Sequence, residues 1–336
     1  MRQAARGWRR ILIWMSGSAA LLCLGGCGMQ PFRVLYPAGP LADAEWRFTI
    51  IDIGITSLIV IPSTLMIALF IWRYRASRRA TYDPHWTNSL PLEIGMWFVP
   101  LSAVCLLGYF SYQGVYATNP YGPTALGEKP AGVKQASTGA THPLQVDVIS
   151  TNWLWIFVYP KQKIATVDEL VVPTGRNVAL NLTSATVVND FYIPQVAPMI
   201  DAMPGMRTED ALRIDRPGDY TGFSAMYSGP GFAWMQFHTR AVSTGQFDAW
   251  VAQVQKSPMH LSYPEFEKLA QPTINLFEKS AEFSQADPNL LRQVYYAARA
   301  GKAYPVPFDL TRHMKETYEN FLLSKRLNSM EAQHAG

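Results

Sequence analysis

Two long apolar runs dominate the first third of the chain. The first runs from Phe48 to Trp72 with one charge, Asp52, near its start, and the second runs from Ile94 to Tyr116 without a charge. Each run exceeds the ~20 residues that an α-helix needs to cross the ~30 Å hydrocarbon core of a bilayer. We therefore predict transmembrane helices at 48–72 and 94–116, joined by a loop over 73–93.

The loop between the two runs is basic, and loops rich in Lys and Arg stay on the cytoplasmic side of a membrane. We therefore predict that 73–93 is cytoplasmic and that the outer ends of the helix pair, with everything after residue 117, face the periplasm. The basic residues are Arg73, Arg75, Arg78 and Arg79.

A shorter apolar stretch, Ile11–Leu24, follows an Arg-rich start and ends in Leu24-Gly25-Gly26-Cys27. A basic start, an apolar middle and small residues at the end describe a secretory signal. The last four residues also resemble the bacterial lipoprotein box, in which the cysteine carries lipid. We predict a signal peptide over 1–26, lipid on Cys27 and a periplasmic segment over 27–47. The alternative is a signal anchor with an incidental cysteine.

The pattern changes after the second run. Residues 117–143 are rich in Pro, Gly, Thr and Ala, which predicts a linker. From Leu144 onward apolar residues alternate as in strands, and turn signals such as Pro204-Gly205 and Gly229-Pro230-Gly231 recur. Short strands between regular turns favour an all-β sandwich or barrel over βαβ units. We place this domain at 144–254, with strands that include Leu170–Val172, Val178–Leu182 and Phe232–Phe237.

Helical spacing of apolar residues replaces the alternation after Pro258. The segments 265–269, 290–299 and 313–327 each fit an amphipathic helix. We therefore predict a helical C-terminal arm over 255–336, lying against partner proteins.

Composition and charge fit a membrane protein. Hydrophobic residues make up 49% of the chain and charged residues 16%, against about 25% charged in soluble proteins. The formal charge of +4 reflects four arginines in the first ten residues, so a mature chain without its leader would be near neutral. A nucleic-acid partner is therefore not expected. The three cysteines, Cys23, Cys27 and Cys105, leave no disulfide framework and no thiolate in the exported domain.

An aromatic run opens the β region. Alternation from Trp153 to Tyr159 places four rings on one face of a strand. Such a face can simply be the core of a sandwich. The run also resembles the aromatic strand of subunit II of haem–copper oxidases, which lies near the site of electron input and faces subunit I. The resemblance implies that role for Trp153, Trp155, Phe157 and Tyr159.

The resemblance extends to the copper-ligand loop of that family and implies a cupredoxin-like fold. Cytochrome c oxidases hold a binuclear copper site with one His followed by Cys-x3-Cys-x3-His-x2-Met, since thiolates and imidazoles suit copper. The Asp201-Ala202-Met203-Pro204-Gly205 turn and the ligand spacing are kept in this chain, but the strong ligands are not. The five ligand positions hold Asn189, Ser224, Ser228, Phe232 and Met235.

Two further residues near these positions do not supply the missing metal ligands. Met226 stands where copper-bearing relatives have an acid that binds magnesium, and a thioether does not hold a hard cation. His238 is three residues from Met235 on a predicted strand, so the two side chains should point to opposite faces. We predict that this chain holds no metal and no other cofactor.

Loss of copper with retention of the fold is typical of cytochrome bo-type ubiquinol oxidases, whose electrons pass from quinol directly to subunit I. The segments 227–232 and 266–270 resemble that branch. The resemblance implies a subunit II that assembles with subunit I, which holds the haems and a single copper, and with subunits III and IV. The complex would oxidise ubiquinol, reduce dioxygen and transport protons in the bacterial inner membrane.

Glu93 begins the second apolar run, seven residues before Pro100. A carboxylate there can be an ordinary interfacial charge, which favours a helix N-terminus. In the related family a carboxylate at this position lies at the mouth of a proton channel into subunit I, so the resemblance implies proton uptake at Glu93. Asp52, near the opposite interface, is expected to be a solvated or capping charge.

Two other functions compete with this interpretation. A subunit II of cytochrome c oxidase would need copper ligands that the sequence does not have. A free-standing periplasmic lipoprotein with a cupredoxin-like binding or sensor domain would explain the signal and the β region. It would give no role to the aromatic run, the arm or Glu93.

Overall fold

The computed structural model describes residues 33–75, 89–119, 143–272 and 281–306. The predicted signal peptide, Cys27, Arg78, Arg79, most of the linker and the helix predicted at 313–327 lie outside these ranges.

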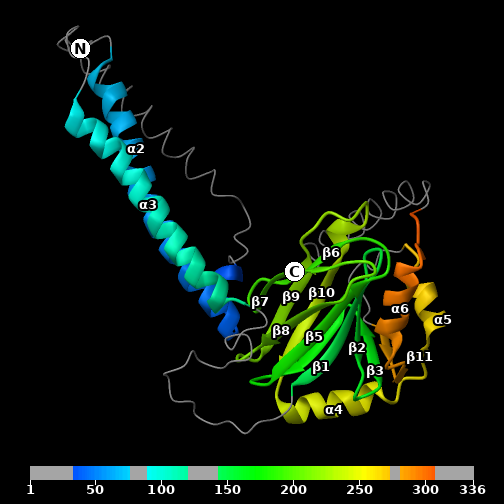
Figure 1. The fold of residues 1–336 in the computed structure, drawn as a ribbon. Helices are drawn as coiled ribbons and strands as arrows, with labels where there is room; N and C mark the ends of the chain where they lie inside the picture. The colour runs from blue at the N-terminus through cyan, green and yellow to red at the C-terminus, as the bar shows by residue number, and fades with distance from the viewer. Residues whose placement is uncertain (1–32, 76–88, 120–142, 273–280, 307–336) are drawn as a thin grey trace, which may run out of the picture. The chain divides into compact units, whose positions relative to one another are not determined.

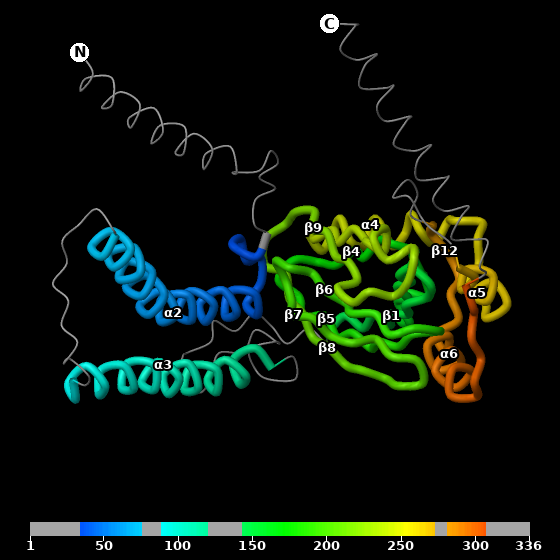
Figure 2. The backbone as a smooth tube through the Cα atoms, turned by 90° about the horizontal axis from the view of Figure 1, so that it is seen from above, coloured from blue at the N-terminus to red at the C-terminus, as the bar shows by residue number. Residues whose placement is uncertain are grey.

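Two long helices follow a 3-10 turn at Arg33–Leu35. They are α2 (Pro40–Arg73) and α3 (Leu90–Ala117), and they lie side by side (Figures 1 and 2). Both are long and apolar enough to cross a membrane. Each has a proline in its first turn, where the missing N–H costs no hydrogen bond. The predicted spans are therefore confirmed as helices, and α2 begins eight residues earlier than the predicted span.

Aromatic side chains gather at both ends of this helix pair. Trp72 and Tyr74 flank Arg73 at the end of α2, and Tyr112 and Tyr116 form an edge-to-face pair near the end of α3. All four rings are exposed within this chain. Tyr and Trp are enriched where a membrane meets water, so their positions agree with helices that span a bilayer.

The β domain is a sandwich of two sheets (Figure 1). The six-stranded sheet consists, in spatial order, of β12 (Ala281–Phe283), β3 (Ile164–Val167), β2 (Trp155–Tyr159), β1 (Leu144–Ser150), β5 (Asn177–Ser184) and β8 (Thr208–Arg213). The five-stranded sheet consists of β4 (Glu169–Pro173), β10 (Gln236–Val242), β9 (Gly218–Ser224), β6 (Asn189–Ile193) and β7 (Ala197–Ala202). Neighbouring strands are antiparallel except β1 with β5 and β4 with β10. The predicted all-β sandwich is confirmed.

The main core lies between the two sheets. Phe191 and Phe237 stack there with ring centroids 5.1 Å apart, and Trp155 and Phe157 pack edge-on or tilted against both rings. Gly222 lies against Phe237 so closely that a Cβ would come within 2.0 Å of the ring. The strands thus enclose a continuous aromatic centre, which sets the spacing of the two sheets.

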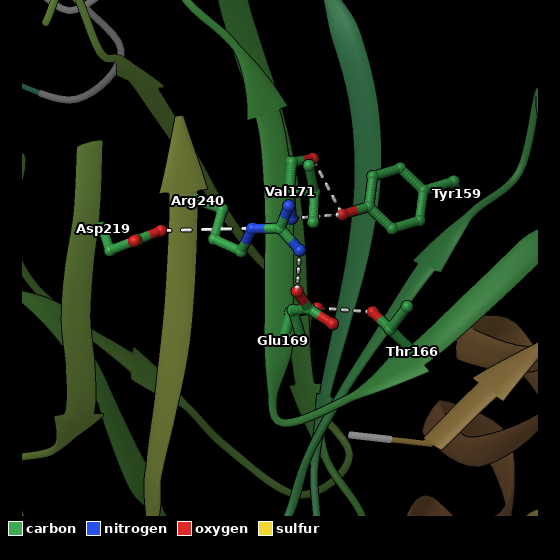
Figure 3. A network of polar contacts seen from close by, with 6 residues as sticks. All are labelled: Tyr159, Thr166, Glu169, Val171, Asp219 and Arg240. Carbon is green, nitrogen blue, oxygen red and sulfur yellow. Dashed lines mark hydrogen bonds and ion pairs between the residues drawn. The ribbon is translucent and has the colours of Figure 1, made fainter. Parts of the chain in front are cut away.

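A polar network joins the sheets where β2 and β3 meet β4 (Figure 3). The Tyr159 hydroxyl donates to the Val171 carbonyl and accepts from the Val171 N–H, both at 2.9 Å. Burial raises the pKa of Tyr159, so the phenol remains a donor. Glu169 forms a salt bridge of 2.8 Å with Arg240, whose guanidinium lies 4.0 Å from Asp219. The two Tyr159 bonds thus tie β4 to the six-stranded sheet, and the salt bridge ties β4 to its neighbour β10.

A short helix, α4 (Thr244–Val254), crosses one end of the strands where the sequence predicted only the end of the β domain (Figure 1). Ser243 and Gln246 form a reciprocal capping box at its start. Phe247 and Trp250 pack into the main core. The strand predicted at 232–237 also differs, because residues 232–234 form a 3-10 turn and the strand begins at Gln236.

The described part of the C-terminal arm completes the domain. It contains β11 (His260–Leu261), α5 (Tyr263–Leu269), β12, β13 (Gln285–Ala286) and α6 (Leu290–Arg299), and β12 extends the six-stranded sheet beside β3. Apolar residues of the arm cover the outer face of that sheet. They are Leu261, Phe266, Phe283, Leu290 and Val294, packed with Ile149, Ile156 and Val158. The described residues of the arm therefore pack on the chain's own sheet.

The residues just before α2 also belong to the sandwich. The Ala38 N–H donates to the Gln195 carbonyl at 2.7 Å, and the Ala38 carbonyl accepts from the Asp215 N–H at 2.9 Å. Gly39 then passes so close to the Arg213 carbonyl oxygen that a Cβ would lie 2.0 Å from it. Only glycine fits this approach.

Candidate functional site

The positions that hold copper in the related family meet at one end of the sandwich. Asn189 begins β6, Ser224 ends β9, and Met235 precedes β10. The Ser224 hydroxyl donates to the Asn189 side-chain oxygen at 3.3 Å, and the Asn189 amide donates to the Thr151 carbonyl at 3.3 Å. The Ser224 N–H donates to the Met235 carbonyl at 3.1 Å. The three positions are thus joined by hydrogen bonds among neutral groups.

The donor set of this cluster does not suit a metal ion. An amide, two hydroxyls and a phenyl ring stand where the family has two imidazoles and two thiolates, and the buried thioether of Met235 is the one ligand kept. Among the described residues, no group of three or more His, Cys, Asp or Glu side chains is arranged to hold a metal. His238 is on the exposed face of β10 whereas Met235 is fully buried, so the two do not converge.

The loop between Ser224 and Met235 lies on Trp153. The Trp153 indole N–H donates to the Ser228 carbonyl at 3.3 Å. Gly231 touches the ring, and a Cβ there would come within 2.2 Å of it. Phe232 does not turn into the cluster but packs edge-on against Tyr227, which is 75% exposed. The loop therefore presents an aromatic pair on the surface of the domain.

The four aromatic residues predicted to face a partner are at most 1% exposed. Trp155, Phe157 and Tyr159 point from β2 into the main core. Trp153 is not on the strand at all, because it adopts a positive φ of 78° in the turn before β2. The rings thus form the core face of the sandwich, and their burial leaves them no surface to present to subunit I.

Glu93 lies in the first turn of α3 beside a groove of about 450 Å³ on this helix. Ile94 and Leu101, near the centre of the groove, lie about 140–160° around the helix from Gly114. Gly114 packs against the Phe48 ring of α2, so the groove faces away from α2. Among the described residues that line it, Glu93 is charged, and the others are the apolar residues Leu90, Ile94, Trp97, Phe98 and Leu101.

Three carboxyl groups of the sandwich were not singled out by the sequence. Asp190 on β6 lies opposite Asp201 on β7, and burial together with the neighbouring Asp201 raises the pKa of Asp190 to about 6. Asp210 on β8 is 3% exposed, and burial raises its pKa to about 7. The sequence offers little indication of these groups, because an Asp within a strand pattern is expected to face solvent unless the strands that pair with it are known.

Comparisons with known proteins agree on one family. Residues 158–242 match the family described as cytochrome C oxidase subunit II, periplasmic domain. The chain is 37% identical over 270 residues to cytochrome bo(3) ubiquinol oxidase subunit 2 of Pseudomonas putida, covering 80% of each chain. It is also 37% identical over 281 residues to ubiquinol oxidase subunit 2 of Acetobacter aceti, covering 83% of this chain and 86% of that one.

The chain belongs to the subunit II family of quinol oxidases.

This subunit II is therefore part of a quinol oxidase complex of aerobic respiration, in the haem–copper oxidase family. It is of the ubiquinol oxidase branch, which lacks the binuclear copper site. Among solved structures, it is similar to the periplasmic domain of subunit II of cytochrome oxidase of Bradyrhizobium japonicum. That match has 25% identity and a TM-score of 0.32, and it covers 34% of this chain and 94% of that one. The quinol oxidase subunit II is a membrane protein with two candidate spans and a periplasmic-type domain.

Proposed function

We propose that this subunit II carries no redox cofactor and acts as the periplasmic cap of a proton-translocating ubiquinol oxidase. In this proposal the haems and the single copper are held by subunit I, and subunits III and IV complete the assembly. The observation that carries the proposal is the hydrogen-bonded cluster of Asn189, Ser224 and Met235 at the former copper positions. A polar cluster without thiolate or imidazole keeps the shape of the domain but cannot relay electrons.

The surface loop gives the cap a means of docking. Tyr227 and Met226 are 75% and 39% exposed, and Tyr227 pairs with Phe232. Tyr, Phe and Met side chains are enriched in the buried centres of protein interfaces. Trp153 supports the loop from below, so the aromatic pair is held in place before a partner arrives. We propose that this loop docks on subunit I.

The groove beside Glu93 supports a second contact within the membrane. A charged side chain facing lipid is costly, and ionisable groups in spans face protein or water-filled cavities. The groove faces away from α2, so that helix does not cover it. We propose that a helix of subunit I lies there and that Glu93 delivers cytoplasmic protons to it.

The basic loop and the helix ends support the orientation in the bacterial inner membrane. With Arg73 and Arg75 on the cytoplasmic side, the positive-inside rule places the β domain in the periplasm. Lipid on Cys27 would add a second attachment to the same periplasmic surface.

Purification of the oxidase from native membranes tests the cofactor-free cap. We expect this chain to copurify with the haem-bearing subunit, and metal analysis to find one copper for the whole complex. Copper beyond that single atom, lost when this chain is dissociated, would favour the cytochrome c oxidase interpretation. A chain that copurifies without any haem protein would favour the free-standing lipoprotein.

Mass spectrometry of the mature N-terminus tests the lipid. We expect a protein that begins at diacylated Cys27, because Leu24-Gly25-Gly26-Cys27 ends an apolar stretch after a basic start. Cys27→Ala should abolish the lipid, yet most of the protein should stay in the membrane because α2 and α3 hold it there. Cys105→Ala is the matched control and should leave the lipid in place. An unmodified N-terminus at any other residue contradicts this prediction.

A further inference from the structure

The described part of the arm ends at a fixed point on the sandwich. Lys302 forms a salt bridge of 2.8 Å with Glu267 of α5, and its Nζ lies 5.7 Å from the centre of the Tyr304 ring. Tyr304 is buried, and its carbonyl accepts from the Asn152 side-chain amide at 2.6 Å. Val306 packs against the main core. Several independent contacts therefore fix the point from which the rest of the chain continues.

That point lies close to the surface loop over the former copper positions. Asn152, which holds the Tyr304 carbonyl, is followed in the chain by Trp153. The Trp153 indole N–H donates to the Ser228 carbonyl of the loop. Because two consecutive residues bridge the arm and the loop, residues 307–312, which can span about 20 Å, suffice to bring the next segment onto the loop.

The surface loop is apolar and exposed. Residues 225–234 include no charged side chain. Tyr227 and Met226 are exposed, and Phe232 is only partly buried beside Tyr227. Apolar side chains gathered on a surface are typical of sites that another segment or another protein covers. The loop therefore has a surface that is more stable when it is covered.

The segment after the fixed end of the arm has an apolar side of matching chemistry. Its sequence predicts a helix over 313–327. Residues three and four apart share one side of a helix, and apolar residues recur at that spacing. They are Met314, Tyr318, Phe321 and Leu322. A helix of this length is marginal in water unless its apolar side packs against something else.

We propose that, before the subunit assembles, the segment 307–327 folds back over the surface loop and covers Tyr227 and Phe232 with its own apolar side. A short tether holds such a segment at an effective concentration of about a millimolar, so it occupies the loop before a separate protein does. Subunit I then displaces the segment when it docks. The cover does not depend on the proposed function, whereas its displacement rests on the proposed docking of the loop on subunit I.

Photo-cross-linking from position 227 tests the cover in the purified full-length chain, held in lipid nanodiscs. Replacing Tyr227 by p-benzoylphenylalanine keeps an aromatic ring and lets it react with whatever touches it. We expect its cross-links to map, by mass spectrometry, to residues 307–327 of the same chain. Phe321→Asp should lower their yield about tenfold, because it removes a ring from the apolar contact and places a charge there.

The matched control is Asn320→Asp, which adds the same charge on the opposite side of the predicted helix. It should leave the yield of cross-links unchanged. Cross-links that form only with lipid, or only with a second copy of the chain, would overturn the cover. So would a yield that Phe321→Asp does not lower.

The same probe in the assembled oxidase separates the cover from the docking. There we expect the cross-links from position 227 to move from residues 307–327 to subunit I. Cross-links that remain on residues 307–327 in the assembled oxidase would contradict the displacement and the docking of the loop, although the cover in the free chain would stand. Cross-links to subunit I in the oxidase, without any to 307–327 in the free chain, would support the docking and overturn the cover.

Discussion

Replacing Asp210 by Asn should stabilise the protein at pH 8 by up to about 4 kcal/mol, or about 10 °C in its unfolding midpoint. Asp210 is buried, its Oδ1 accepts from the Ala211 N–H at 2.8 Å, and its Oδ2 has no partner among the described residues. Its pKa in the folded protein, about 7, lies above the ordinary 3.8. Asparagine keeps the accepted hydrogen bond and removes the charge.

The sign of the effect makes this prediction specific. A raised pKa contributes stability that is complete below pH 3.8 and is lost as pH rises through about 7. The gain from Asp210→Asn should therefore be larger at pH 8 than at pH 5, when both midpoints are followed by tryptophan fluorescence. Glu209→Gln, an exposed neighbour on the same strand, is the matched control and should change stability by about 1 kcal/mol or less at either pH. A gain independent of pH would show that the Asp210 carboxyl does not titrate as its burial requires.

Replacing Glu93 by Gln should lower the turnover of the assembled oxidase about tenfold, equal to about 1.4 kcal/mol in the barrier. Glutamine keeps the shape and hydrogen bonding of the side chain but cannot exchange a proton. Among the described residues that line its groove, Glu93 is the one that carries a charge, so no other carboxylate among them can replace it. Glu93→Asp should recover part of the rate, because it restores the acid one methylene shorter. The measurement is oxygen consumption with a soluble quinol, normalised to haem.

The controls separate proton uptake from a structural role. If Glu93 only stabilises the N-terminus of α3, its removal should cost at most about 1 kcal/mol of helix stability and leave turnover per haem unchanged. Haem content and subunit ratio should stay constant in the variant if assembly is intact. Asp52→Asn, a carboxylate near the other end of the hairpin, should retain wild-type turnover. Wild-type turnover in Glu93→Gln would refute the uptake role.

Local sequence patterns predicted the elements that depend mainly on residues close together in the chain. The two apolar runs are long enough to require membrane helices, and the structure has them as α2 and α3. The resemblance to the copper-ligand loop predicted that Asn189, Ser224 and Met235 lie together, and hydrogen bonds join them in the structure. The amphipathic segments at 265–269 and 290–299 are helices, as predicted.

The sequence was a poor guide where contacts between residues far apart in the chain determine the structure. An amphipathic helix shows that it covers an apolar surface, but not whose surface, so no local pattern places α6 on the chain's own sheet. Alternation extended the aromatic strand back to Trp153, although the backbone turns there with a positive φ. Asp190 and Asp201 meet only through the pairing of β6 with β7, which the sequence pattern did not specify. The start of α4 was recognisable from Ser243 and Gln246.

The pairing of β12 with β3 can form only late in the synthesis of the chain. A chain emerges from the ribosome from its N-terminus, so β3 exists well before residues 281–283 arrive to pair with it. Until then β3 has an unpaired edge, and Ile149, Ile156 and Val158 lack the cover that the arm supplies. Unpaired edges and bare apolar faces are prone to aggregate. Nascent chains that stop before residue 281 should therefore need a chaperone, whereas chains that have passed residue 306 can protect themselves.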